Sequence, residues 1–338
     1  MSKIFVKDKA FLRTDFQPFM QDFVKACKLN GFESKPDLLP SYRFHVRSML
    51  CRALLAKYNV DVRFRAKALS NKKFSKALLI ASNGGMILQN AFPYFCDYKI
   101  VPMLWDVWPH SWENIYDNIK RFNITTVFVT VRSFSEKLNH DLNIHAHWIP
   151  EGIETSYYQR GEDLDRRGHN ILEIGRKHPE YHAMLESMKN YGLLDNYQTS
   201  KTNQDGTLDQ KDLAFPNFLD LTSALPHYKV MVTFPQCDSN PQRTGELETL
   251  TQRYWEAMLS RCVMIGRAPK ELIDLIGYNP VVNVDWAQPA EQLQAVLNHI
   301  SDYQDLVNHN YRVAQAKAGW STRIETIINE LRNDGYEI

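Results

Sequence analysis

The chain has 338 residues, of which 44% are hydrophobic and 23% are charged. This is the composition of an ordinary globular protein, and the length favours two domains of roughly 150 residues each. A formal net charge of +1 excludes a general attraction to nucleic acid, so no nucleic-acid partner is expected. No apolar run approaches the ~18 residues of a membrane span, and the first residues lack the apolar core of a signal peptide.

The cysteines are five in number and scattered, without a Cys-x-x-Cys pair: Cys27, Cys51, Cys96, Cys237 and Cys262. This pattern predicts neither a disulfide framework nor a zinc site, and it is most simply explained by a reducing compartment. The expected location is therefore the cytoplasm, with attachment to the inner face of the membrane left open.

Positive charge is concentrated in residues 43–76, where ten Lys or Arg stand against the single acid Asp61. Such a segment suits an anionic membrane surface or a phosphorylated acceptor. It is equally typical of a solvated helix face, and both interpretations stay open.

The first half alternates short apolar runs with amphipathic stretches. Helices are predicted over 16–29 and 42–57, and strands rich in buried and β-branched residues over 3–7, 76–82, 99–106, 125–131 and 145–150. Strands that alternate with helices indicate a parallel sheet with helices on both faces.

A polar, charged linker over 154–168 precedes a second cycle of the same kind. Strands are predicted over 170–176, 193–199, 228–235, 261–266 and 281–286, and helices over 179–190, 216–225, 249–260 and 269–276. The predicted organisation is an α/β domain over 1–152, a second over 153–318, and a C-terminal helix over 319–338 that is able to cross back onto the first. Ligands are expected at the carboxyl ends of the strands.

The most informative stretch runs from Thr233 to Gly266, TFPQCDSNPQRTGELETLTQRYWEAMLSRCVMIG. Glu248 precedes a predicted helix, and Glu256 lies two turns inside it with seven residues between the two. The stretch resembles the Glu-x(7)-Glu motif of GT-B glycosyltransferases, in particular the retaining group-1 (family-4-like) class. Where that class commonly has a small residue and Gly, this chain has Ser260 and Arg261.

Three further segments resemble the same family in the same order. WIPEGIETSYY (148–158) is similar to its interdomain hinge, ILEIGRKH (171–178) to the strand that opens its donor domain, and LWDVWP (104–109) to a strand end of its acceptor domain. The resemblance implies two Rossmann-like doubly wound domains facing across a cleft, and a nucleotide-sugar donor bound by the second domain. It also implies that no cofactor and no catalytic metal are needed.

A sugar nucleotide carries two phosphates, which predicts where its binding groups lie. The helix start at Thr249, Leu250 and Thr251 offers backbone N–H groups to a diphosphate, and Arg176 and Lys177 offer positive charges after the first strand of the second domain. The resemblance implies that Glu256 accepts the two ribose hydroxyls and that Glu248 contacts the donor sugar. Without a ligand, Glu248 would be a helix cap and Glu256 a solvated face residue.

The acceptor side carries fewer signals. The family commonly has a His before the Asp of its LWDVWP-like strand end, and here that position is Trp105. Asp106 and His110 are the candidates to orient an acceptor hydroxyl, with Asp106 as a general base if the enzyme inverts. A turn cap and a surface histidine are the alternatives.

The resemblance therefore implies sugar transfer from a nucleotide-sugar to a carbohydrate or lipid-linked acceptor, as in bacterial surface polysaccharide synthesis. Retention is expected, and inversion stays open. Two alternatives remain: a nucleotide-sugar epimerase of the same fold, and a non-catalytic nucleotide-sugar-binding protein.

Overall fold

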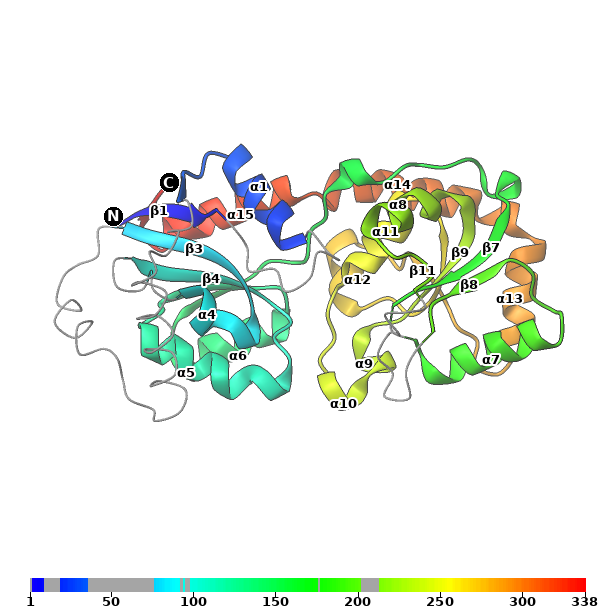
Figure 1. The fold of residues 1–338 in the computed structure, drawn as a ribbon, viewed down its shortest axis with the longest axis horizontal. Coiled ribbons are helices and arrows are strands. Elements are labelled where there is room, and N and C mark those ends of the chain that lie inside the picture. Colours follow the sequence, from blue (N-terminus) through cyan, green and yellow to red (C-terminus); the bar gives the residue numbers. More distant parts are fainter. Residues whose placement is uncertain are drawn as a thin grey trace. The chain divides into compact units, whose positions relative to one another are not determined.

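The computed structural model describes residues 2–8, 19–35, 76–91, 94, 98–175, 177–201 and 213–338. The chain divides into two compact units. The first consists of Met1–Ile149 and Arg323–Ile338, and the second of Pro150–Thr322. Each unit is built on one parallel β-sheet with helices packed on it (Figure 1). The predicted α/β class is confirmed.

The sheet of the first unit has seven strands within the described residues. Their order is β12-β1-β3-β4-β5-β6, with β2 also paired to β1. The strands are β1 (Ser2–Lys7), β2 (Ser34–Lys35), β3 (Lys76–Asn83), β4 (Lys99–Trp105), β5 (Thr126–Val129), β6 (His145–Trp148) and β12 (Tyr336–Glu337). Its α-helices are α1 (Phe19–Leu29), α4 (Ile87–Ala91), α5 (Trp112–Phe122), α6 (Arg132–Leu142) and, from Arg323 on, α15 (Trp320–Asn333).

The central strands of this sheet are buried on both faces, as expected for a parallel sheet covered by helices. Every residue of β5 is buried, and so are all residues of β4 after Lys99. Trp105, at the end of β4, packs its ring against Phe19 and Phe23 of α1, with ring centroids 5.9 and 5.4 Å away. Trp105 is therefore part of the core of this unit.

The second unit has a five-stranded sheet of order β11-β10-β9-β7-β8 within the described residues. Its strands are β7 (His169–Glu173), β8 (Tyr197–Thr199), β9 (Tyr228–Thr233), β10 (Val263–Gly266) and β11 (Val281–Asn283). Its α-helices are α7 (Pro179–Asn190), α8 (Phe218–Ala224), α9 (Gln236–Ser239), α10 (Pro241–Thr244), α11 (Gln252–Leu259), α12 (Lys270–Ile276), α13 (Pro289–Asn298) and α14 (Gln304–Lys317).

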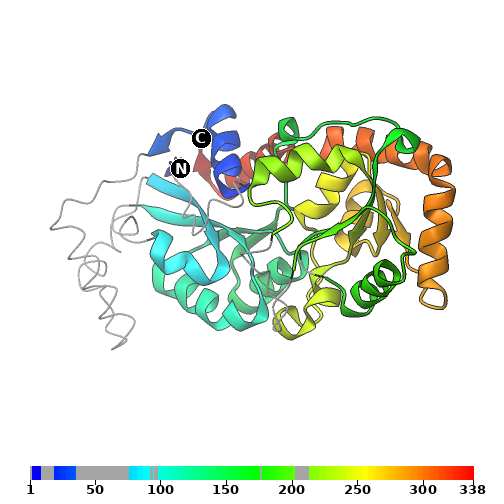
Figure 2. The same ribbon diagram turned by 45° about the vertical axis from the view of Figure 1, so that its right-hand side comes forward.

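Successive side chains of β9 and β10 point to opposite faces of the sheet, and this divides the core of the second unit into two layers. Val230 and Val232 pack in the layer that contains residues of α7 and α13, whereas Met231 packs in the layer of α8, α11 and α12. Helix α14 contributes Val307 to the first layer and Ala314 to the second. Val263 and Met264 of β10 divide in the same way. The two groups of helices lie on opposite faces of the sheet (Figures 1 and 2). This sandwich leaves the carboxyl ends of the strands for loops.

Candidate functional site

The order of strands in the second unit creates a crevice between β7 and β9. From β7 the chain passes to β8 on one side of the sheet, and the later strands β9, β10 and β11 are added on the other side. The loops that follow β7 and β9 therefore run away from each other. In open α/β sheets, ligands bind outside the carboxyl ends of the strands at such a switch point.

A pocket of about 490 Å³ lies at this place. It is lined by residues at or after the carboxyl ends of β7, β9, β10 and β11: His178, Glu180, Phe234, Asp238, Gly266, Arg267, Asn283, Val284 and Trp286. Four separate strand ends supply the walls, so only the folded sheet brings these residues together. The volume lies in the range of pockets for small organic ligands.

Aromatic rings form one wall of this pocket. The ring of His178 lies 4.6 Å from that of Phe234 and 4.8 Å from that of Trp286, measured between centroids. Trp286 is 45% exposed, which leaves a large ring face open to a ligand. Burial lowers the pKa of His178, which favours the neutral form of its ring. Flat apolar faces of this kind are suited to stacking against a nucleobase.

A network of charges forms the other side of the pocket. Arg267, directly after β10, donates from Nε and Nη2 to the two carboxylate oxygens of Asp238, each at 2.6 Å. Its Nη1 donates to Glu248. The hydrogen bonds to Asp238, followed by that to Glu248, raise the pKa of Arg267 above its ordinary value. Two carboxylates thus share one guanidinium. Arg267 and Asp238 line the pocket, and Glu248 is bound to Arg267 without lining it.

Glu248 is held from two directions. One carboxylate oxygen accepts from Arg267, and the other accepts from the backbone N–H of Lys270 at 2.8 Å. Lys270 begins α12, so the carboxylate occupies the electropositive end of that helix. The side chain is 24% exposed, and lone pairs of the carboxylate remain for hydroxyl donors.

Gly266 allows the end of β10 to approach β9 closely. Its φ is +143°, and a Cβ at this position would lie 1.9 Å from the carbonyl oxygen of Thr233. The backbone N–H of Arg267 donates to the same oxygen at 3.0 Å. A glycine is therefore needed to direct Arg267 into the pocket.

Glu256 is buried within the second unit, with 4% of its surface exposed. One of its oxygens accepts a hydrogen bond from Tyr158 Oη at 3.2 Å, and the other lies 2.8 Å from Arg253 Nη1. The Arg253 guanidinium in turn lies over Gly175, where a Cβ would be 3.3 Å from Nη2. Glu256 is thus paired with Arg253, whose guanidinium reaches the loop after β7.

The start of α11 differs in detail from the predicted phosphate site. The helix begins at Gln252 with Thr251 as its N-cap. The backbone N–H of Leu250 donates to Glu271 Oε2 at 2.9 Å, which assigns it a partner inside the protein. Thr249 is buried, and its hydroxyl donates to the carbonyl oxygen of Leu250 at 3.4 Å.

Of the two cations predicted after β7, the structure describes only one. Arg176 lies outside the described residues. Lys177 directs its amine to His182 of α7, with 3.3 Å between Nζ and Nε2, and it does not line the pocket. Burial lowers the pKa of Lys177, while the charge of Glu173 opposes that shift. The pocket receives His178 from this loop.

Two buried groups at the carboxyl end of β9 lack a hydrogen-bond partner among the described residues. They are the hydroxyl oxygen of Thr233 and the amide nitrogen Nε2 of Gln236, whose side chains are at most 5% exposed. Buried polar groups without partners are uncommon, and each needs an explanation. A polar ligand at this strand end would provide one.

In the first unit, Asp106 and His110 both follow β4. Asp106 has a φ of +50°, a left-handed conformation that aspartate adopts more readily than most residues. Gly84 makes room for this turn, since a Cβ there would lie 3.3 Å from the Asp106 carbonyl oxygen and 2.8 Å from Ile115. His110 is exposed in a short 3₁₀ turn, Pro109–Ser111. At this strand end His110 is exposed and Asp106 is half-buried.

The sequence prediction missed Arg267, Asp238 and the aromatic wall. Arg267 carried a signal, because it directly follows the predicted strand 261–266. The three aromatic residues carried none, since each comes from a different strand end. Of the basic segment 43–76, only Lys76 lies within the described residues. Among the helices of the described part, none has the length and apolar character to cross a membrane.

No protein-family model matches the chain, and no curated protein is similar to it in sequence. Solved structures do resemble it. Sucrose-phosphate synthase from Thermosynechococcus elongatus aligns at 14% identity with a TM-score of 0.56, over 98% of this chain and 99% of that one. The α,α-trehalose-phosphate synthase (UDP-forming) from Burkholderia vietnamiensis aligns at 12% identity with a TM-score of 0.56, over 98% and 100%.

The structure of TarM aligns at 11% identity with a TM-score of 0.51, over 76% of this chain. The chain spans about half the length of TarM, since the match covers 54% of it. These likenesses show the fold, and the chain has the GT-B fold with two Rossmann-like units, as the sequence predicts.

Proposed function

We propose that this chain is a glycosyltransferase that binds a nucleotide-sugar in the pocket of its second unit. The main support for this proposal is that an aromatic wall and hydrogen-bonded carboxylates occur together at the switch point between β7 and β9. His178, Phe234 and Trp286 suit the base of a nucleotide, and Glu248 and Asp238 suit sugar hydroxyls. The solved structures of the same fold include a UDP-forming synthase, which agrees with a nucleotide-sugar donor.

The diphosphate requires positive charge, for which we propose Arg253 together with Arg176. The Arg253 guanidinium lies over the backbone of Gly175, where the absence of a side chain allows an anion to approach. Preorganised cations of this kind stabilise the charge that grows on the diphosphate as the glycosidic bond breaks. Lys177 and the N–H groups of Thr249 to Thr251 remain further candidates, although Leu250 already donates to Glu271.

Within this proposal, Glu256 binds the ribose hydroxyls and Glu248 orients the donor sugar. The first unit would take the acceptor, with Asp106 or His110 positioning its hydroxyl. We propose retention of the anomeric configuration, where the leaving diphosphate receives the acceptor proton and no protein nucleophile is needed. The acceptor would be a carbohydrate or a lipid-linked carbohydrate of a surface polysaccharide, and the basic segment 43–76 would attract an anionic membrane surface.

The first test is calorimetric titration with UDP, GDP and ADP and with UDP-glucose and GDP-mannose. Micromolar binding of one nucleotide that Trp286→Ala weakens would support the assignment of the pocket. No binding of any nucleotide, or binding that Trp286→Ala leaves unchanged, would overturn that assignment.

The second test follows the bound nucleotide-sugar by NMR with and without carbohydrate acceptors. Release of nucleoside diphosphate that depends on an acceptor would support transfer, and the anomeric signal of the product would report retention or inversion. Conversion to an epimer without acceptor would identify an epimerase. Binding without any turnover would identify a non-catalytic binding protein.

A further inference from the structure

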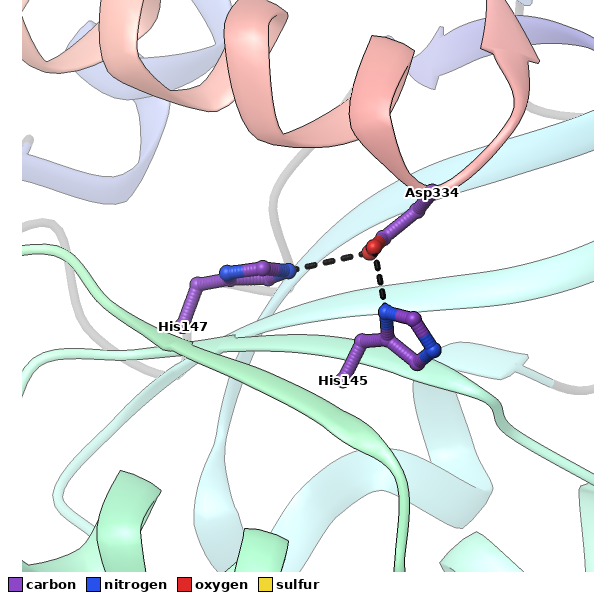
Figure 3. A group of neighbouring side chains, drawn as sticks. All are labelled: His145, His147 and Asp334. Atoms are coloured by element: carbon purple, nitrogen blue, oxygen red, sulfur yellow. Dashed lines mark hydrogen bonds and ion pairs between the residues drawn. The ribbon is translucent and has the colours of Figure 1, made fainter.

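A separate cluster of side chains lies in the first unit, away from the strand ends discussed above. His145 and His147 belong to β6, and Asp334 follows the end of α15 (Figure 3). Asp334 Oδ1 lies 2.5 Å from His145 Nδ1, and Asp334 Oδ2 lies 2.9 Å from His147 Nε2. One potential ligand atom from each residue lies within 4.8 Å of the other two. The cluster thus presents two imidazoles and a carboxylate toward one point.

The spacing of the histidines follows from the geometry of a strand. Residues two apart on a strand project from the same face, so His145 and His147 both face the segment that carries Asp334. The ring of His147 is also stacked on Phe128 of β5 at 5.4 Å, which fixes its plane. Asp334 accepts a hydrogen bond from Thr126 Oγ1 at 2.9 Å, and its side chain is only 4% exposed. Two of the three groups are therefore held before any ligand binds.

His147 lies between two carboxylates. Its Nε2 is 2.9 Å from Asp334, and its Nδ1 is 3.5 Å from Glu330 Oε2. A neutral imidazole carries only one N–H. If that N–H faces Glu330, the lone pair of Nε2 faces the lone pairs of Asp334, an arrangement that a bound cation would stabilise.

The same geometry is typical of metal sites. A histidine that binds a metal through one ring nitrogen nearly always donates its other N–H to a carboxylate or a carbonyl group. Glu330 stands in that outer position relative to His147. Two imidazole nitrogens and one carboxylate form a ligand set that zinc and similar divalent ions accept, with water as a fourth ligand.

We propose that His145, His147 and Asp334 bind a divalent transition-metal ion, with zinc matching their chemistry best. Ligand atoms around a tetrahedral zinc are about 3.4 Å apart, so the His145–Asp334 and His147–Asp334 separations of 2.5 and 2.9 Å must each widen by less than about 1 Å. His145, whose side chain is 62% exposed, has room for this movement. The ion would join β6 to a residue that lies 187 positions after His147. Its role would be structural, independent of sugar transfer.

The test uses the full chain freed of metal and titrated with Zn²⁺ in a calorimeter, with Co²⁺ absorption as a check on tetrahedral geometry. We expect one ion per chain and a rise in Tm of roughly 5–10 °C at a hundredfold excess over Kd. His145→Asn, an exposed position that should not disturb folding, should abolish both effects. Glu330→Gln should weaken binding roughly 10- to 100-fold.

His140→Asn is the matched control. His140 also contacts an aspartate, with Nδ1 2.8 Å from Asp141 Oδ1, but its side chain is 88% exposed and it lies outside the three-residue cluster. The control variant should bind Zn²⁺ as the original chain does. If the unaltered chain takes up no ion, or if His145→Asn and His140→Asn bind alike, the site does not exist.

Discussion

The carboxylate of Glu248 accepts a 2.8 Å hydrogen bond from the backbone N–H of Lys270, the first residue of α12. With Arg267 on its other oxygen, the side chain of Glu248 is held in one orientation beside an arginine that lines the pocket. A group held in this way is suited to orienting a ligand, because little further ordering is required when the ligand binds.

Glu248→Gln should reduce the rate of sugar transfer roughly 100-fold, because the amide loses the ion pair with Arg267 and with it the fixed orientation. The free energy of unfolding should fall by about 1–2 kcal/mol through loss of charge-assisted hydrogen bonds. Glu246→Gln, at an exposed position two residues earlier, is the control and should change neither quantity. Steady-state kinetics and urea unfolding measure both effects, and equal behaviour of the two variants would contradict the role of Glu248.

Trp286→Ala should weaken binding of the preferred nucleotide by about 1–3 kcal/mol, or roughly 5- to 150-fold in Kd, since one stacking face is lost. Tyr191→Ala is the control, because Tyr191 is an aromatic residue that is 79% exposed and does not line the pocket. Calorimetry with the nucleotide alone measures the effect. A Kd that is unchanged in Trp286→Ala would show that the base lies elsewhere.

Gly266→Ala should cost about 3 kcal/mol or more in stability, because its Cβ would overlap the carbonyl oxygen of Thr233 and its φ is positive. Gly277→Ala separates the two causes. Gly277 has a φ of +89°, and no atom lies within 4 Å of the position that a Cβ would take there, so only backbone strain applies and about 1 kcal/mol is expected. Urea unfolding of both variants tests the difference, and equal losses would rule out the close approach of β9 and β10.

The thiol of Cys237 should react slowly with iodoacetamide at neutral pH. Burial, followed by the charge of Asp238, raises its pKa to about 11, so the reactive thiolate is scarce below that pH. The rate should rise about tenfold per pH unit up to about pH 11. Asp238→Asn should speed the reaction, because the anion that raises the pKa is removed.

Arg267→Ala should slow the same reaction, because the Arg267 charge lowers the pKa of Cys237. Mass spectrometry of the peptide that contains Cys237 separates it from the other cysteines, of which Cys27 and Cys262 are buried. Rates that already level off near pH 9 would contradict the raised pKa.

The strands of the second unit could be predicted because their apolar runs are long and uninterrupted. The predicted strand 228–235 corresponds to β9 (Tyr228–Thr233), and the predicted helix 249–260 to α11 (Gln252–Leu259). The two-residue strands β2 and β12 were missed, since pairs this short carry no periodicity. The pattern of apolar residues in the sequence thus predicts the strands and helices that bury the most apolar surface.

The site was predicted only in part, for a physical reason. Glu248 and Glu256 stand on one continuous segment, and their spacing is visible in the sequence. His178, Phe234 and Trp286 meet only because three strand ends are neighbours in the sheet. A side chain whose partners are set by topology leaves no local signal.

Arg261 departs from the sequence pattern of the family that the chain resembles. It stands where the resembling family commonly has Gly, and it adopts a left-handed φ of +55° after α11. The backbone hydrogen bonds of a helix end are present, with Cys262 N donating to the Ala257 carbonyl at 2.9 Å. Its guanidinium bonds Asp163 at 2.5 Å, a contact that offsets the strain of the conformation. The helix end after the Glu-x(7)-Glu motif therefore keeps its backbone geometry, although Arg261 stands in place of the usual glycine.

The first unit is assembled from both ends of the sequence, with Tyr336 paired in register to Ser2. During synthesis on the ribosome, residues 2–149 must wait until the intervening segment has been made before their sheet is complete. The second unit is continuous in sequence and can reach its native state earlier. Chains interrupted late in translation would therefore carry a folded second unit and an unfinished first one, and such products would be substrates for chaperones and proteases.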